Sequence, residues 1–262
     1  MKIAILGAGA FGTALGEILA GKGYDIDYYD SKAERERLSD ALTFAKYIVL
    51  AIPSKAAPFL LPHLPKETPL IIATKGFLDD HNFTSFKDYM VLSGPGFAAD
   101  IKAERETHLT CTDERVRNLF GTDYLDFDFT TDRKGVLMCG ALKNIYALLA
   151  GYLDLRPNSV EYERFLTEVV EEMSALLSVN GAEPNTVNLN CGVGDLRLTC
   201  DFPSRNYEFG QILRKSPSAM PEKTVEGFTA LAKVKRGEII VPETAYKLRE
   251  LIKVSDAWGA EL

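Results

Sequence analysis

Short apolar runs separated by helix-like segments make up the first half of the chain. The runs that we expect to form strands are Lys2–Leu6, Asp25–Asp30, Tyr47–Ile52, Pro69–Thr74 and Met90–Ser93. Most are apolar without interruption, which is typical of strands covered on both faces of a parallel sheet. Polar and apolar residues alternate in His108–Thr112 and Leu125–Thr130, so these segments are expected to be edge or antiparallel strands. Phe11 to Lys22 and Lys32–Ala45 are expected helices, and the alternation predicts an α/β fold with a doubly wound sheet.

Helices dominate the chain beyond Thr131. One long helix is expected from Asp132 to Leu153, and a second over Glu161–Asn180, with Gly181 as its stop. The second helix carries one apolar stripe, as expected when a single face is buried. The stripe consists of Phe165, Leu166, Val169, Val170, Met173, Leu176 and Leu177. We therefore expect an α/β domain of residues 1–131 followed by an all-α domain of residues 132–262.

Composition and charge exclude some classes of partner. The chain is 46% hydrophobic and 26% charged, as in ordinary globular proteins. Its net charge of −7 argues against a general affinity for nucleic acid or an anionic membrane, although a local basic cluster can still bind a small anion. The most apolar stretch, Val136 to Leu155, is interrupted by Lys143, Asn144 and Asp154. We expect a buried helix there and no stable membrane insertion.

Cysteine and histidine show no metal-binding pattern. The residues of these two types are Cys111, Cys139, Cys191, Cys200, His63, His81 and His108. They form no CxxC pair and are far apart in sequence, so no metal site is expected. The cysteines are expected to be reduced thiols that serve as small apolar residues. Met1 and Lys2 lead directly into the first strand, without the regions of a signal peptide, so a cytoplasmic location is expected.

The turn after the first strand has the spacing GxGxxG. Gly7 would make the tight turn, Gly9 would let the backbone approach a pyrophosphate, and Gly12 would allow close packing of helix and strand. The helix that follows would offer its N-terminal N–H groups and positive dipole end to the phosphates. A glycine turn without a ligand is the simpler alternative, but the strand before it and the helix after it favour a dinucleotide site in a Rossmann-type domain.

Asp30 bears on the choice of dinucleotide. It ends the second strand, 18 residues beyond Gly12, where a carboxylate can accept hydrogen bonds from an adenosine ribose and repel a 2′-phosphate. NAD is therefore favoured over NADP. Lys32 and Arg35 lie close enough in sequence to temper that preference.

Four polar islands in apolar or glycine-rich surroundings are candidates for a substrate site: residues 73–76, 140–144, 194–200 and 204–210. Lys143 is the most unusual, because it is a cation within an apolar helix. A lysine that extends to the surface is the simpler alternative. Simpler alternatives exist for the other islands as well. Asp195 could merely cap a helix at Gly194, and Ser204–Asn206 could be a helix-starting loop with a surface arginine.

Eight segments, in order along nearly the whole chain, resemble the NAD(P)-dependent glycerol-3-phosphate dehydrogenase family. They are GAGAFGTALG (7–16), AIPS (51–54), ATKGF (73–77), LSGPGFAADI (92–101), GALKN (140–144), GVGDLRLTC (192–200), SRNYEFG (204–210) and VEGF (225–228). The resemblance implies reversible hydride transfer between NADH and dihydroxyacetone phosphate, a phosphorylated triose, giving sn-glycerol 3-phosphate for phospholipid synthesis.

The resemblance also implies catalytic roles for three residues. Lys143 matches the family's catalytic lysine, which would donate a proton to the carbonyl oxygen and remove it in the reverse reaction. Lys75 matches a second lysine that would polarise the same oxygen. Asp195 would orient Lys143.

Further residues are implied to bind substrate and cofactor. Asn144 and Thr199 would bind substrate oxygens, while Ser204, Arg205 and Asn206 would hold the phosphate, to which a guanidinium can make two parallel bonds. The residues expected to contact the cofactor are Gly7, Gly9, Ala10, Phe11, Gly12, Asp30, Pro53, Ala98, Arg205 and Glu226. An apolar helical second domain often serves as a dimer surface, so a homodimer is a candidate assembly.

The chain departs from the family at several positions. Between Asp30 and Tyr47 it lacks an Asn…Leu-Pro-Gly stretch that relatives usually carry, so a strand and part of the cofactor-side surface are expected to be missing. Leu137 stands where relatives commonly have a glutamate, and Tyr207 where a second arginine is common. Two other functions stay open: a related dehydrogenase of another small oxo acid, and a non-catalytic NAD-binding module. Retention of both lysines argues against the module.

Overall fold

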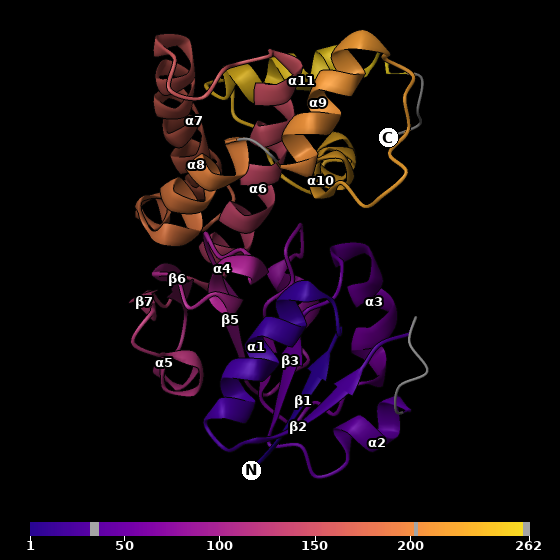
Figure 1. Cartoon of the computed structure of the whole chain (residues 1–262). Helices are drawn as coiled ribbons and strands as arrows, with labels where there is room; N and C mark the ends of the chain where they lie inside the picture. Colours follow the sequence, from indigo (N-terminus) through magenta and orange to yellow (C-terminus); the bar gives the residue numbers. More distant parts are fainter. Residues whose placement is uncertain (32–36, 202–203, 259–262) are drawn as a thin grey trace. The chain divides into compact units, whose positions relative to one another are not determined.

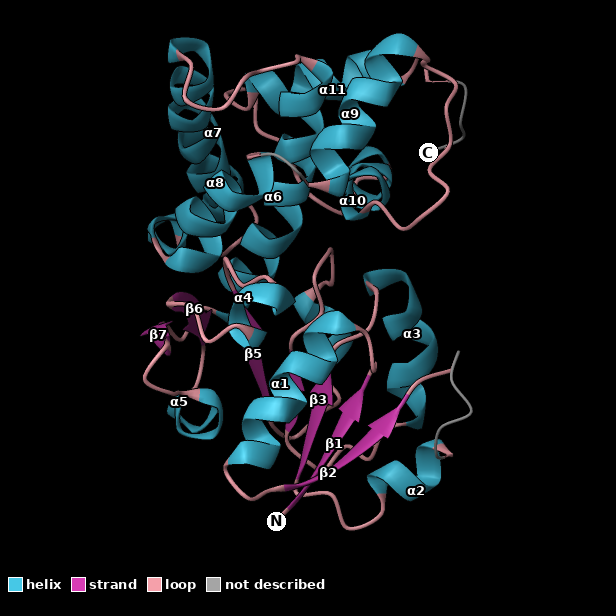
Figure 2. Ribbon diagram, viewed as in Figure 1, coloured by secondary structure: helices cyan, strands magenta, loops and turns pink. Residues whose placement is uncertain are grey.

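The computed structural model describes residues 1–31, 37–201 and 204–258, in two compact units (Figure 1). Unit 1 comprises Met1–Lys75 and Asp79–Arg133, and unit 2 comprises Gly76–Leu78 and Lys134–Leu262. Figure 2 shows that unit 1 contains a sheet with helices and that unit 2 is built from helices. The expected fold class, a Rossmann-type doubly wound sheet followed by an all-α domain, is confirmed.

Unit 1 is organised around a seven-stranded sheet in the order β2-β1-β3-β4-β5-β6-β7. The strands are β1 (Lys2–Leu6), β2 (Asp25–Tyr29), β3 (Tyr47–Leu50), β4 (Leu70–Ile72), β5 (Tyr89–Ser93), β6 (Thr107–Cys111) and β7 (Leu125–Phe129). Neighbouring strands are parallel except β5 and β6, where Leu92 pairs with Cys111 in antiparallel register. The two alternating segments thus form an antiparallel strand, β6, and an edge strand, β7, as expected.

Both faces of this sheet are covered. Its helices are α1 (Ala10–Gly21), α2 (Leu38–Leu42), α3 (Ala57–Leu60), α4 (Ala98–Lys102) and α5 (Glu114–Phe120). Ile3 and Ile5 on one face pack with Leu15 and Leu19 of α1. The residues that alternate with them on β1, such as Leu6, are equally buried on the opposite face. Uninterrupted apolar strands are stable only in such a two-sided environment.

The connection from β2 to β3 differs from the sequence-based expectation. A helix over Lys32–Ala45 is expected, but the described helix spans only Leu38–Leu42. Phe44 has a φ of 62°, a left-handed conformation that a helix cannot continue through. Residues 32–36, which include Lys32 and Arg35, lie outside the described residues. Residues 37–46, the described part of this connection, form no strand, and β2 lies at the edge of the sheet. Both observations agree with the expected loss of a strand.

Unit 2 is all helical in its described residues. Its helices are α6 (Arg133–Tyr152), α7 (Val160–Val179), α8 (Asp195–Cys200), α9 (Arg205–Lys215), α10 (Glu226–Lys235) and α11 (Tyr246–Ser255), with short 3-10 and π turns before α8. Every residue of α6 from Gly135 to Gly151 is buried. This helix is long and apolar enough to cross a membrane by length and composition, but 94% of its apolar window is buried inside the protein. Such burial is typical of a core helix.

A buried carboxylate joins three of these helices. Glu172 of α7 accepts hydrogen bonds from the Tyr146 hydroxyl of α6 at 2.9 Å and from two backbone N–H groups, of Lys247 at 2.7 Å and Leu248 at 3.2 Å. These N–H groups lie in the first turn of α11, where the helix itself supplies no acceptor. Glu172 therefore caps α11 from a neighbouring helix and fixes the framework around α6.

Candidate active site

The glycine turn between β1 and α1 has the conformation that its sequence predicts. Gly7 has a φ of 110°, and its N–H donates to the Tyr29 carbonyl at 2.8 Å. A Cβ at Gly7 would overlap the Ala51 carbonyl oxygen, and a Cβ at Gly12 would overlap the Gly7 carbonyl oxygen. Both positions therefore require glycine for packing inside unit 1.

Gly9 differs from its two neighbours. Its φ is −70°, which any residue can adopt, and a Cβ there would meet no protein atom within 4 Å. Gly9 is the N-cap of α1, and no side chain caps the N-terminus of this helix. An open backbone surface at an uncapped helix N-terminus fits a diphosphate, which would occupy the space that a side chain would otherwise fill. The turn thus fits the dinucleotide that the sequence predicts.

Asp30 lies directly against this turn. Its Oδ2 accepts a hydrogen bond from the Ala8 N–H at 3.1 Å, although the two residues are 22 positions apart. The bond holds the carboxylate beside the glycine turn, at the carboxyl end of β2. A fixed negative charge there can accept hydrogen bonds from ribose hydroxyls and would repel a 2′-phosphate.

Lys75 follows β4 at the same edge of the sheet. Its ammonium donates to the Gly96 carbonyl at 2.7 Å and lies 4.6 Å from the centroid of the Phe11 ring. Phe11 belongs to the first turn of α1, and Gly96 to the turn after β5, just before Ala98. Because carboxyl ends of parallel strands meet at one edge, two other segments of unit 1 contact Lys75. The carbonyl of Gly96 is a partner that sequence reasoning missed, since the Ser93–Gly96 segment alone looks like an ordinary turn.

Pro53 also follows a strand at this edge. It comes three residues after the end of β3 and precedes the short 3-10 turn Ser54–Ala56. The predicted cofactor residues of unit 1 therefore follow β1, β2, β3 and β5, as expected for ligand binding beyond the carboxyl ends of the strands.

Lys143 of α6 and Asp195 of α8 form a buried ion pair in unit 2. Their side chains are 4% and 2% exposed, and the Lys143 Nζ donates to the Asp195 Oδ2. The alternative of a lysine extending to the surface is therefore wrong. The capping alternative for Asp195 is also wrong, because Gly194 is the N-cap of α8 and no side chain caps that helix.

The surroundings of this pair are also buried. Thr199 donates its hydroxyl to the Asp195 carbonyl at 2.6 Å, and its Oγ1 lies 3.4 Å from the Asp195 Oδ1. Burial raises the pKa of the adjacent Cys200 thiol, although the positive charge of Lys143 acts in the opposite direction. The thiol is therefore neutral at physiological pH, and the ion pair lies in a region of low dielectric constant.

Two buried asparagines, Asn144 next to Lys143 in sequence and Asn206 of α9, are hydrogen-bonded to each other. The Asn144 Nδ2 donates to the Gly140 carbonyl at 2.8 Å, and its Oδ1 accepts from the Asn206 Nδ2 at 2.8 Å. The Asn206 Oδ1 in turn accepts from the Gly227 N–H at 2.8 Å. The structure thus brings Asn144, Asn206 and the start of α10 together.

Ser204 and Arg205 begin α9. Ser204 is its N-cap, and its oxygen accepts from the Tyr207 N–H at 3.1 Å. Arg205 is exposed, with its Nη1 donating to the Thr224 carbonyl at 3.3 Å. The helix-starting loop with a surface arginine is therefore present. Its guanidinium contacts the segment that leads into Glu226, the first residue of α10.

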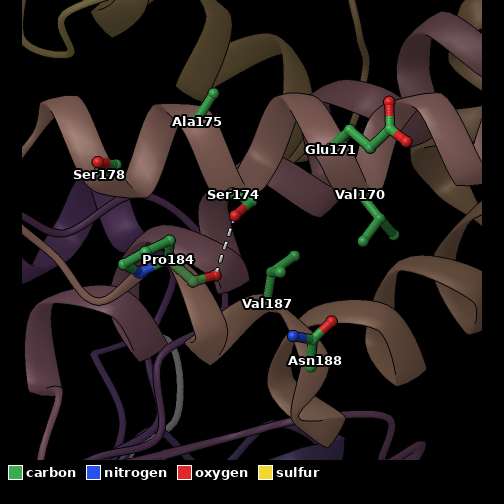
Figure 3. Close-up of a pocket in the computed structure, with 8 residues that line it drawn as sticks. All are labelled: Val170, Glu171, Ser174, Ala175, Ser178, Pro184, Val187 and Asn188. Carbon is green, nitrogen blue, oxygen red and sulfur yellow. Dashed lines mark hydrogen bonds between the residues drawn. The ribbon is translucent and has the colours of Figure 1, made fainter.

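A groove of about 550 Å³ lies elsewhere in unit 2, between α7 and the Pro184–Asn188 segment (Figure 3). Its lining residues are Val170, Glu171, Ser174, Ala175, Ser178, Pro184, Val187 and Asn188. None of them is a predicted site residue, and the groove holds no convergent charged pair, so the chemistry is assigned to the Lys143 region. Among the described residues, no group of three or more His, Cys, Asp or Glu side chains could hold a metal ion.

Comparison with known proteins gives consistent results. Residues 132–249 match the family model described as NAD-dependent glycerol-3-phosphate dehydrogenase C-terminus. A glycerol-3-phosphate dehydrogenase [NAD(P)+] from Maridesulfovibrio salexigens is 30% identical over 310 residues, covering 95% of this chain and 93% of the relative. One from Leptospira biflexa is 32% identical over 270 residues, covering 83% of this chain and 80% of the relative.

A solved structure supports the same fold. The crystal structure of a glycerol-3-phosphate dehydrogenase from Coxiella burnetii matches with a TM-score of 0.79 and 24% identity, covering 98% of this chain and 97% of the other. The alignment with the Maridesulfovibrio relative is longer than this chain of 262 residues. The relative therefore has insertions, in agreement with the shortened connections of this chain.

Proposed function

Since this chain belongs to the NAD(P)-dependent glycerol-3-phosphate dehydrogenase family, we propose that Lys143, Asp195 and Lys75 carry out its reaction. The protein is an oxidoreductase that interconverts dihydroxyacetone phosphate and sn-glycerol 3-phosphate with NAD or NADP. In the direction of reduction, the carbonyl carbon gains a hydride and its oxygen gains a proton. A bound nicotinamide would supply the hydride, and side chains of the protein would supply the proton.

The buried Lys143–Asp195 pair is the observation that carries this proposal. An ammonium in a water-excluded site can donate a proton to a carbonyl oxygen as negative charge develops there. In the reverse reaction the resulting amine accepts the proton from the alcohol. The Asp195 carboxylate orients the Lys143 Nζ by accepting its hydrogen bond, and the Thr199 hydroxyl donates to the Asp195 backbone carbonyl.

Lys75 polarises the same oxygen. Its bond to the Gly96 carbonyl and its position over the Phe11 ring limit where the ammonium can point. A fixed positive charge stabilises a developing alkoxide more effectively than a mobile one, because no reorganisation is needed during the reaction.

The substrate is held by residues from three helices of unit 2. Arg205 binds the phosphate with its guanidinium, together with Ser204 and Asn206 at the start of α9. Asn144 and Thr199 bind the oxygens of the triose. Asn144 and Asn206 each donate one amide N–H to a protein acceptor, and each has a second N–H for a substrate oxygen.

We assign dinucleotide binding to the predicted domain of residues 1–131 and most of the catalytic groups to the predicted domain of residues 132–262. The residues assigned to the cofactor are Gly7, Gly9, Ala10, Phe11, Gly12, Asp30, Pro53, Ala98, Arg205 and Glu226. Asp30, which is held by the Ala8 N–H, favours NAD over NADP.

We also propose a cytoplasmic homodimer that supplies glycerol 3-phosphate to phospholipid synthesis. The four cysteines are buried and form no disulfide, which suits a reducing compartment. Exposed apolar residues of unit 2, including Val193 and Val179, are candidates for an interface. The molecular mass in solution, measured by light scattering, tests the dimer.

The decisive test of the reaction is NADH oxidation with dihydroxyacetone phosphate, with Lys143→Ala as the control. Turnover by the wild type and its loss in the variant would support the proposal. NADH binding without turnover would favour a non-catalytic NAD-binding module. If dihydroxyacetone reacts as well as its phosphate, the substrate is another small oxo compound, because a phosphate site predicts a strong preference for the phosphorylated triose.

A further inference from the structure

Two buried amides connect three helices of unit 2 in a single chain of hydrogen bonds. The chain runs from the Gly227 N–H at the start of α10, through the Asn206 side chain of α9, to the Asn144 side chain of α6 and the Gly140 carbonyl. Each of the three bonds is 2.8 Å long. Asn144 and Asn206 are only 5% and 8% exposed, so water competes little with these bonds.

The two ends of this hydrogen-bond chain determine which atom of each amide faces which neighbour. The Gly227 N–H can only donate, so the atom of Asn206 that faces it must be the oxygen. The Gly140 carbonyl can only accept, so the atom of Asn144 that faces it must be the amide nitrogen. The two amides then meet as donor and acceptor, and neither can turn over without placing two like groups against each other. Each amide therefore has one orientation.

The start of α10 lies directly on α6 at this point. A Cβ on Gly227 would overlap the backbone carbonyl oxygen of Asn144 and would lie 3.0 Å from the Asn206 Oδ1. Asn144 is the residue after Lys143, and Glu226 is the residue before Gly227. Asn206 consequently holds two elements of the site at once: the α6 turn that carries Lys143, and the N-terminus of α10.

We propose that Asn206 is a positioning residue of the reaction, whose main contribution is to hold Asn144 and the start of α10 in place. This inference rests on the proposed function of Lys143 and Arg205. Direct contact between Asn206 and the substrate phosphate is then a minor contribution. The consequence is a distinctive substrate dependence: loss of Asn206 affects phosphorylated and unphosphorylated substrates alike, because both use the same Lys143.

Asn206→Leu is the most informative variant. A leucine is close in size to asparagine and carries no charge, so it removes both hydrogen bonds of the Asn206 side chain without adding repulsion toward a phosphate. The Gly227 N–H and the Asn144 oxygen then lose their buried partners. Asn144→Leu breaks the hydrogen-bond chain at the other amide and serves as a second variant if Asn206→Leu does not fold.

The test compares kcat/KM for dihydroxyacetone phosphate and for dihydroxyacetone, with NADH. We expect Asn206→Leu to lower both values about 10- to 100-fold and to keep their ratio within about threefold. Arg205→Ala is the matched control on the same helix turn, and it should reduce the ratio itself, because it removes the phosphate contact. A loss confined to dihydroxyacetone phosphate, or no loss with either substrate, would overturn the inference.

Amide hydrogen exchange at Gly227 provides a readout that does not depend on turnover. In Asn206→Ala this amide loses its acceptor, so its exchange should accelerate at least about tenfold, whereas Glu208→Ala, an exposed position on α9, should leave it unchanged. Unchanged exchange in Asn206→Ala would overturn the inference. If the wild type does not turn over dihydroxyacetone phosphate, the proposed function fails, and the exchange measurement still decides whether Asn206 holds α10.

Discussion

The Lys143 ammonium of α6 is paired with the Asp195 carboxylate of α8, and both side chains are almost completely buried. A buried charge is stable only when it is paired, so each residue depends on the other. The same burial keeps water away from the ammonium and strengthens its interaction with charge that develops on a substrate. The pair thus has a structural requirement, and the proposed mechanism gives it a catalytic role; variants can separate the two.

A single substitution in this pair should lower stability far more than the double substitution. Lys143→Met leaves Asp195 as an unpaired buried charge, and we expect the free energy of unfolding to fall by about 3–5 kcal/mol. Lys143→Met/Asp195→Leu removes both charges and should recover most of that stability. Neither variant should oxidise NADH with dihydroxyacetone phosphate at more than about 1% of the wild-type rate. Urea unfolding and initial rates provide the two measurements; recovered activity in the double variant would contradict the catalytic assignment.

Gly9 should be required for cofactor binding but not for folding. A Cβ at this position meets no protein atom within 4 Å, and its φ is ordinary, so Gly9→Ala should change the free energy of unfolding by less than about 0.5 kcal/mol. Its Kd for NADH, measured by fluorescence titration, should rise at least about tenfold, because the methyl group occupies the diphosphate surface. Gly12→Ala is the control and should destabilise the fold, since its Cβ overlaps the Gly7 carbonyl. Normal NADH affinity in Gly9→Ala would place the diphosphate elsewhere.

Asp30 should determine the preference for NADH. Asp30→Asn removes the negative charge beside the glycine turn while keeping an oxygen that can accept the Ala8 N–H. We expect the ratio of kcat/KM for NADH to that for NADPH to fall about 10- to 100-fold, because the 2′-phosphate is no longer repelled. Steady-state rates with both cofactors measure this ratio. An unchanged ratio would mean that another group selects the cofactor.

Glu172 should be a strong determinant of stability in unit 2. Glu172→Gln keeps the shape of the side chain but replaces one acceptor oxygen by a donor, which faces either the Tyr146 hydroxyl and Leu248 N–H or the Lys247 N–H. We expect a loss of about 2–4 kcal/mol in the free energy of unfolding. Its neighbour Glu171 is exposed, so Glu171→Gln should change stability by less than about 0.5 kcal/mol. Equal effects of the two variants would contradict this role.

Stability should decline at alkaline pH in part because of Cys111. Burial raises the pKa of its thiol from 9.0 to about 11. Between these values the thiol loses its proton on unfolding, so rising pH favours the unfolded chain. Its contribution is complete below pH 9 and is lost between pH 9 and pH 11. Urea unfolding over this pH range should therefore show a smaller decline for Cys111→Ala than for the wild type, and equal slopes would contradict the assignment.

Local sequence patterns determined several parts of this protein without help from the tertiary structure. The strand, glycine turn and helix from Lys2 to Gly21 follow from steric requirements and apolar pattern within one short segment. The same holds for α7, whose apolar stripe predicted a helix over Glu161–Asn180 where the structure has one over Val160–Val179. The expected helix over Lys32–Ala45 is interrupted in the described residues at Arg37, whose ψ is 146°, and ends before the left-handed Phe44; neither conformation has a signal in the apolar pattern.

Tertiary structure decided which polar residues act together. Lys143 on an apolar helix was compatible with a surface lysine until the fold supplied Asp195, 52 residues further along the chain. Lys75 likewise obtains its partner Gly96 from a separate strand-ending turn, and Asn206 obtains Gly227 from another helix. Apolar periodicity reports on burial within one element, whereas a polar contact depends on how separate elements pack. The sequence therefore determined the elements and the candidate residues, and packing decided their partners.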